Sequence, residues 1–157
     1  MKKSYKLIIS LLAPLAAGAI GSVFTVSTIP GWYATLVRPG FTPPNWLFGP
    51  AWTLLYILMG SALFFVWKAT ADKTAKTRAI GIFVFQLILN TLWSFIFFGL
   101  HKIGLALIEI AILWLAILAT ILAFSKISRT AAWLLAPYIL WVSFAGYLNC
   151  SLFLLNR

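Results

Sequence analysis

The sequence predicts an all-α integral membrane protein, a single domain folded as a bundle of five transmembrane helices. Hydrophobic residues make up 63% of the 157 residues and charged residues only 9%, whereas a water-soluble domain has about 25% charged residues. The charged residues are clustered, and they separate five apolar stretches with at most one charge each. A helix that crosses the roughly 30 Å hydrocarbon layer needs about 20 mostly apolar residues, and each stretch is long enough.

The five spans are predicted at about 6–27, 45–68, 79–100, 103–124 and 130–154, and a loop at about 28–44 joins the first two. The fourth contains LALIEIAILWLAILATILAF, which is apolar all round. A strand of a membrane barrel would instead alternate in polarity over about ten residues, so the pattern indicates helices. The first span has a rival interpretation as a secretory signal cleaved at Ala17-Gly18-Ala19, but its uncharged run continues well past that site.

The net charge of +10 is placed in a way that argues against nucleic-acid binding. Five spans put nine basic residues on the side of the N-terminus and only Arg38, Lys102 and Arg157 on the other side. Basic residues are enriched in cytoplasmic loops, so we expect a cytoplasmic N-terminus and an external C-terminus. The chain shows no organelle-targeting extension, and we expect it in the inner membrane of a bacterial cell.

The loop at 28–44 leads into the proline-rich stretch RPGFTPPNWLFGPAW. Proline fixes φ and pushes the preceding residue toward extended backbone, so this segment is expected to be stiff. Pro43 and Pro44 suit the opening turn of the second span, and Pro50 predicts a kink or a delayed start of regular helix. Two interpretations stay open: an ordinary loop with an interfacial aromatic belt, or a lid over a pocket.

Aromatic and amide side chains share helix faces inside three spans. Amides at mid-membrane depth are costly without partners, so these faces are expected to point into the bundle. They indicate either interhelical hydrogen bonds and core packing, or a cavity for a large, flat, mostly apolar ligand. The faces comprise Trp52 and Tyr56; Gln86, Asn90 and Trp93; and Tyr138, Trp141, Ala145 and Asn149.

Three further features of the spans have more than one interpretation. Ala13, Ala17 and Gly21 form a small-residue stripe, which permits close packing within the bundle or a dimer contact. Glu109, the only acid in the spans, is a candidate for proton transport or for pairing with a cation, or it is a hydrogen-bonded packing residue. His101 is either a haem ligand or a solvated side chain. With one histidine and one cysteine the chain offers no zinc cluster, and no catalytic set is recognisable.

Three segments in order resemble the TspO/MBR family, the translocator proteins once called peripheral benzodiazepine receptors. The resemblance implies a five-helix bundle that commonly forms homodimers, with a pocket opening toward the loop between the first two helices. It also implies porphyrin or haem as ligand and no required cofactor, while animal members bind cholesterol and benzodiazepine-type drugs. The segments are WYATLVRPGFTPPNWLFGPAWTLLYILMG (32–60), QLILNTLWSFIFF (86–98) and PYILWVSFAGYLN (137–149).

The same resemblance assigns ligand-binding positions, and Tyr56 joins them because it lies one turn after Trp52. The cholesterol consensus of animal members is absent, because Cys150 stands at its tyrosine and no Lys or Arg follows Tyr147 within five residues. A tetrapyrrole is therefore favoured over a sterol. The positions are Trp32, Pro43, Pro44, Trp52, Gln86, Asn90, Trp93, Trp141, Phe144, Ala145 and Leu148.

Together these observations predict a membrane receptor or transporter that binds a porphyrin-like ligand under an external lid. Motion of the lid at 28–44 would control access of the ligand to its pocket. One alternative is enzyme-like, light-dependent porphyrin degradation through a pocket tryptophan. Another is a small proton-coupled exporter that uses Glu109.

Overall fold

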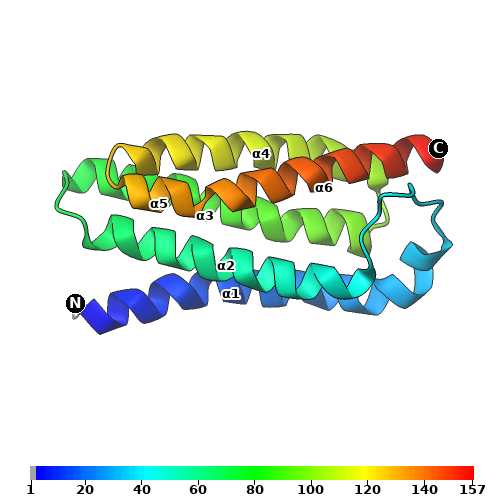
Figure 1. Ribbon diagram of the computed structural model, residues 1–157, viewed down its shortest axis with the longest axis horizontal. Coiled ribbons are helices and arrows are strands. Elements are labelled where there is room, and N and C mark those ends of the chain that lie inside the picture. Colours follow the sequence, from blue (N-terminus) through cyan, green and yellow to red (C-terminus); the bar gives the residue numbers. More distant parts are fainter. Residues whose placement is uncertain (1–2) are drawn as a thin grey trace.

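The computed structural model describes residues 3–157 and confirms an all-α fold with five membrane spans (Figure 1). The spans contain 23 to 31 residues, enough to cross a bilayer, and the chain is a multi-pass membrane protein. Two of them end in π-helical turns, η1 and η2. The elements are α1 (Lys3–Thr28), η1 (Ile29–Tyr33), α2 (Asn45–Lys68), α3 (Lys73–Ser94), η2 (Phe95–Gly99), α4 (Ile103–Ser125), α5 (Arg129–Leu134) and α6 (Ala136–Leu155).

The helices run roughly along one axis, so the connections gather at the two ends of the bundle (Figure 1). The N-terminal end of α1 lies at the same end as the α2–α3 and α4–α5 connections. The α1–α2 loop, the α3–α4 turn and the C-terminus lie at the opposite end. Of the basic residues that the structure describes, only Arg38, Lys102 and Arg157 lie at the end with the α1–α2 loop and the C-terminus. The other basic residues described lie at the end where α1 begins.

The first span extends further than the sequence indicates. Helical structure continues from Thr28 through η1 and includes Trp32, so the connecting loop covers about 36–44 instead of 28–44. Gly31 lies within η1 at φ −101° and ψ −107°, outside the helical region, so two helical segments meet there at a kink. Glycine tolerates such a conformation because it lacks a Cβ.

The remaining helix ends follow from local capping and proline chemistry. The third span starts at Lys73, before the predicted 79, because the Asp72 carboxylate accepts a hydrogen bond from the Ala75 N–H at 2.9 Å. The fifth span is divided at Leu135, just before Pro137, which lacks the N–H that would continue the helical ladder. α2 begins at Asn45, immediately after Pro44, and it continues through Pro50 without a delayed start.

α1 packs on α2 and α3 through very small residues. Gly60 of α2 sits against the backbone of Ser10 and Leu11, and Gly21 of α1 faces the Ser94 side chain. The Thr91 hydroxyl donates to the Ala17 carbonyl at 3.2 Å. Ala17 and Gly21, two members of the small-residue stripe, therefore pack within this chain. Ala13, the third member, is exposed.

Candidate ligand-binding site

A cavity of about 570 Å³ lies inside the half of the bundle nearest the α1–α2 loop. All five spans line it, although α4 contributes only Ile110 and Leu113. Its volume falls within the roughly 300–1,000 Å³ typical of small-molecule pockets. The bundle therefore encloses a space large enough for an organic ligand.

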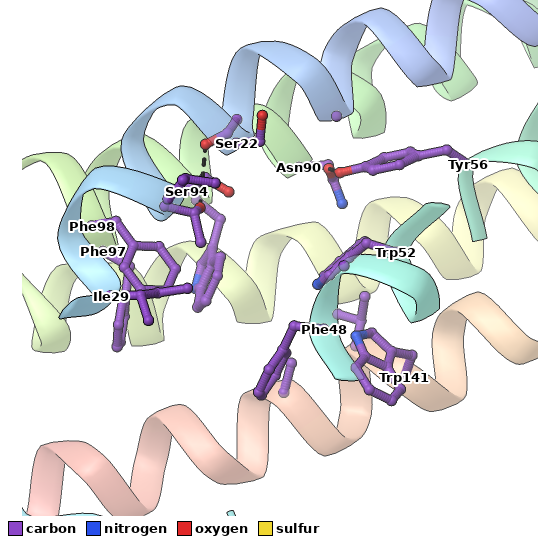
Figure 2. A pocket seen from close by; sticks show the side chains of 18 of the residues that line it. Ser22, Ile29, Phe48, Trp52, Tyr56, Asn90, Ser94, Phe97, Phe98 and Trp141 are labelled. Carbon is purple, nitrogen blue, oxygen red and sulfur yellow. Dashed lines mark hydrogen bonds between the residues drawn. The ribbon is translucent and has the colours of Figure 1, made fainter. Parts of the chain in front are cut away.

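Aromatic side chains face one another across this cavity (Figure 2). Phe48 and Trp52 of α2 lie beside Trp141 of α6, and Phe97 and Phe98 of η2 lie at the other side. Phe48 packs edge-on against Trp141 with ring centroids 6.0 Å apart, while Phe97 and Phe98 pack against each other at 4.8 Å. These mutual contacts hold the rings in place, so the walls are rigid and apolar.

The amide of Asn90 belongs to a hydrogen-bond chain that joins three helices at the wall of the cavity. The Tyr56 hydroxyl donates to Asn90 Oδ1 at 2.7 Å, and Asn90 Nδ2 donates to the Tyr138 hydroxyl at 3.0 Å. The Tyr138 hydroxyl in turn donates to Gln86 Oε1 at 2.9 Å. Gln86 and Asn90 are both buried, as the sequence predicts, and here they connect helices.

Replacing Tyr138 by phenylalanine is expected to lower the free energy of unfolding by about 1–2 kcal/mol. The change keeps the buried ring but leaves Asn90 Nδ2 and Gln86 Oε1 without their partner, and unsatisfied buried groups cost about this much. Thermal unfolding in detergent measures the effect. Tyr147→Phe, at an exposed position of the same helix, is the matched control, and equal losses in both variants would contradict this explanation.

A second polar contact fixes the orientation of a cavity tryptophan. The Trp93 indole N–H donates to Asn149 Oδ1 at 3.1 Å, and Asn149 Nδ2 donates to the Ile103 carbonyl at 3.0 Å. Trp93 also stacks on Phe97 with centroids 5.0 Å apart. This tie between α3, α4 and α6 keeps Trp93 in the cavity wall.

The cavity reaches the outer surface of the bundle between α1 and α2. Val26 on α1 is 68% exposed and Trp46 on α2 is 72% exposed, yet both also line the cavity. One turn after Trp46, a Cβ added at Gly49, another lining residue of α2, would meet no atom within 4 Å. The cavity is therefore thinly covered on the flank that faces lipid.

The structure brings together seven of the positions named from the sequence and leaves the others outside the cavity. Gln86 lies at the far end of the hydrogen-bond chain, and Trp32 stacks on His101 with centroids 4.3 Å apart. Pro43 and Pro44 line a separate hollow formed by the α1–α2 loop itself and the start of α2. Phe144 contacts Trp141 but not the cavity. The positions that line the cavity are Trp52, Tyr56, Asn90, Trp93, Trp141, Ala145 and Leu148.

The contribution of α1 to the cavity is missing from the sequence-based site. Gly18, Ser22 and Val26 line one wall, although α1 shows no aromatic or amide stripe. Phe48 was also missed, yet it lies one turn before Trp52 on the same helix. Extending the Trp52–Tyr56 stripe backward by four residues would have found Phe48, whereas no pattern in α1 indicated its role.

The α1–α2 loop is fastened to α6 near the cavity. The Asn156 side chain accepts a hydrogen bond from the Val37 N–H and donates to the Val37 carbonyl, both at 2.9 Å. Phe41 stacks on Tyr147 with ring centroids 5.0 Å apart. These contacts hold the loop across the end of the bundle at residues far apart in sequence.

Replacing Asn156 by alanine is expected to increase hydrogen exchange at 36–41 by about tenfold. The change removes both side-chain hydrogen bonds to Val37, and each neutral bond contributes about 0.5–1.5 kcal/mol. Exchange measured by mass spectrometry reports this local opening. Arg157→Ala is the control at the neighbouring position, and unchanged protection in Asn156→Ala would show that the aromatic contacts alone hold the loop.

Glu109 and His101 both lie outside the cavity. Glu109 is buried in α4, and neither of its carboxylate oxygens has a hydrogen-bond partner within residues 3–157. His101 has φ 56°, the one positive value at a non-glycine residue of the described chain, and its ring stacks on Trp32. Neither side chain is placed to contact a ligand held between Trp52 and Trp141.

The chain matches a known protein family over nearly all of its length. The TspO/MBR family profile matches residues 10–155, nearly the whole chain. The chain belongs to the TspO/MBR family.

Relatives within the TspO/MBR family come from archaea, bacteria and animals. The chain is 46% identical over 151 residues to the tryptophan-rich protein TspO of Archaeoglobus fulgidus, covering 96% of this chain and 97% of that one. It is 44% identical over 142 residues to the tryptophan-rich protein TspO of Chlorobaculum tepidum, covering 90% of each. The human translocator protein is 39% identical over 139 residues, which is 88% of this chain and 82% of the relative.

Proposed function

We propose that this TspO/MBR protein is a membrane receptor or transporter that binds a tetrapyrrole, porphyrin or haem, in the cavity between α2, α3 and α6. The observation that carries the proposal is the pair of indoles, Trp52 and Trp141, which line a cavity of about 570 Å³. A flat aromatic macrocycle gains affinity by stacking on such faces and by burying its apolar surface.

The polar groups of the cavity wall support this ligand class. Asn90 and Trp93 already use their hydrogen-bonding groups on neighbouring helices. The site therefore offers mainly apolar contact with few free polar groups, which suits a ligand whose centre is apolar and whose polar groups lie at its edge. Such polar edge groups would lie at the exposed flank between α1 and α2, near Trp46.

Filling the cavity tests the proposal directly. Ala145→Phe adds a ring at a lining position, and it is expected to weaken protoporphyrin binding at least tenfold by competing for the same space. Absorbance titration of the purified protein in detergent gives the dissociation constant. Ala111→Phe, at an exposed position of α4, makes the same chemical change away from the cavity. Equal affinities in the two variants would refute the location.

Illumination of the porphyrin complex distinguishes the enzyme-like alternative from the receptor or transporter function. If Trp52 and Trp141 take part in porphyrin breakdown, illumination of the complex must produce a new absorbing species faster than porphyrin in detergent alone. Binding without such a product leaves the receptor or transporter function standing. The exporter alternative predicts that Glu109→Gln abolishes coupled transport, but the cavity lining does not include Glu109.

The arrangement of basic residues supports an orientation in the inner membrane of a prokaryotic cell. The end of the bundle that carries Lys68, Arg78 and Arg129 would face the cytoplasm, because basic loops are retained there. The α1–α2 loop and the nearby cavity would then face the outside. Single cysteines introduced at Lys73 and Gly40 in a Cys150→Ser background test this orientation in whole cells. An impermeant thiol reagent is expected to label the cysteine at position 40 and not the one at position 73.

A further inference from the structure

Another hollow, of about 510 Å³, lies at the opposite end of the molecule from the ligand cavity and from the loop hollow lined by Pro43 and Pro44. Three lysines line it: Lys3 and Lys6 from the first turns of α1, and Lys68 from the last turn of α2. Phe65 and Ile127 supply apolar surface between α2 and the α4–α5 connection. Three lysines therefore line one hollow that also has apolar walls.

The positive charge of this hollow is not neutralised by the chain. The sequence contains only two acids, Asp72 and Glu109. Asp72 caps α3 through the Ala75 N–H, and Glu109 is buried in the half of α4 nearer the other end. Lys68 instead lies over an aromatic ring, with its Nζ 4.5 Å from the centre of Phe65. The hollow therefore has an excess of positive charge that favours an anion from outside the chain.

The position of the hollow indicates where that anion comes from. Lys3 begins the first membrane span and Lys68 ends the second, so the hollow lies at the level of the lipid headgroups. Basic pockets between the ends of membrane helices bind phosphate-bearing headgroups, and lysine supplies a strongly hydrated point charge that suits this role. Phe65 and Ile127 can contact the glycerol and upper acyl region of the same lipid molecule, which a soluble phosphate lacks.

We propose that the hollow lined by Lys3, Lys6 and Lys68 is a binding site for the headgroup of an anionic phospholipid. The site holds one lipid of the surrounding leaflet against α1, α2 and the α4–α5 connection. It shares none of its lining residues with the ligand cavity, so it is independent of the proposed tetrapyrrole function.

Native mass spectrometry of the detergent-purified full chain, titrated with phosphatidylglycerol or phosphatidylcholine, tests the site. The unmodified protein is expected to bind the first phosphatidylglycerol at least tenfold more tightly than phosphatidylcholine. A Lys3→Gln/Lys6→Gln/Lys68→Gln variant is expected to lose most of this preference. Absence of a preference in the unmodified protein, or its full retention in the variant, would overturn the proposal.

A matched variant separates a defined site from a diffuse positive surface. Lys73→Gln/Arg78→Gln/Lys126→Gln removes the same charge from exposed positions at the same end, outside the hollow, and is expected to change the preference less than threefold. If both triple variants lose the preference for phosphatidylglycerol equally, the proposal of a defined site is overturned.

Further lysine variants and a competition with inorganic phosphate complete the test. Circular dichroism shows whether the triple glutamine variant folds. If it does not fold, Lys6→Gln alone is expected to weaken phosphatidylglycerol binding measurably. Replacement of all three lysines by arginine is expected to retain this binding. Inorganic phosphate at about 10 mM is expected not to displace the lipid, because it lacks the apolar contacts. Displacement at that concentration would identify a soluble phosphate ligand and overturn the lipid assignment.

Discussion

Replacing Trp141 by alanine is expected to weaken protoporphyrin binding by about 30-fold or more. Loss of a buried aromatic anchor at a binding site commonly costs about 2 kcal/mol or more, which corresponds to roughly this factor. Trp141 lines the cavity next to Phe48, so its removal takes away both stacking area and the support of a second ring. Trp52→Ala is expected to act in the same direction, because Trp52 occupies the adjacent part of the wall.

The measurement is an absorbance titration of porphyrin, which does not depend on the fluorescence of the tryptophan removed. Trp133→Ala provides the control, since Trp133 is 76% exposed on α5 and lies outside the cavity. Its affinity should match that of the unmodified protein. If Trp141→Ala and Trp133→Ala bind porphyrin equally well while both remain folded, the cavity is not the porphyrin site.

Gly60→Ala is expected to destabilise the bundle by about 1–2 kcal/mol. An added Cβ would lie 2.7 Å from the Ser10 carbonyl oxygen and 2.8 Å from Leu11 Cα, and both atoms belong to the backbone of α1. Backbone atoms cannot rotate away, so α1 and α2 must separate, and overpacking of this kind costs about 1–3 kcal/mol or more. The gain of about 1 kcal/mol in helix propensity from glycine to alanine is smaller than this cost.

Gly81→Ala is the control that changes helix propensity without introducing a steric clash. Gly81 lies in α3, and a Cβ there would meet no atom within 4 Å. This variant is expected to keep or slightly raise the unfolding temperature in detergent, whereas Gly60→Ala lowers it. Equal unfolding temperatures in the two variants would show that α1 adjusts its position without cost.

Separation of α1 from α2 would also affect the cavity. Gly18 and Val26 on α1 line the wall opposite Trp52, and the cavity is already thinly covered between these two helices. We therefore expect Gly60→Ala to weaken porphyrin binding as well, although Gly60 itself does not line the cavity. The packing of α1 thus connects stability with the shape of the site.

The number and approximate limits of the spans could be predicted from the sequence, because they depend on local properties. Lysine and arginine are costly in the hydrocarbon layer, so Lys68 and Arg129 mark span ends regardless of how the helices pack. Burial of Gln86 and Asn90 was predictable for a similar reason, since an amide in lipid lacks partners. The division of the fifth span at Leu135 and the helical placement of Trp32 were missed. Pro137 is compatible with the first turn of a new helix or with a kink in a continuous one, and Gly31 tolerates helical and non-helical backbone.

The sequence determined that this chain crosses the membrane five times, which ends carry the basic residues, and which faces of the second, third and fifth spans turn inward. Only the tertiary structure decided what those inward faces do. Helical periodicity is the same for a side chain that packs, one that bonds another helix and one that lines a cavity, so Gln86 and Trp141 were indistinguishable by pattern. Contacts between residues far apart in sequence separate them: Tyr138 holds Gln86 in an interhelical chain, while Phe48 packs beside Trp141 in the cavity wall.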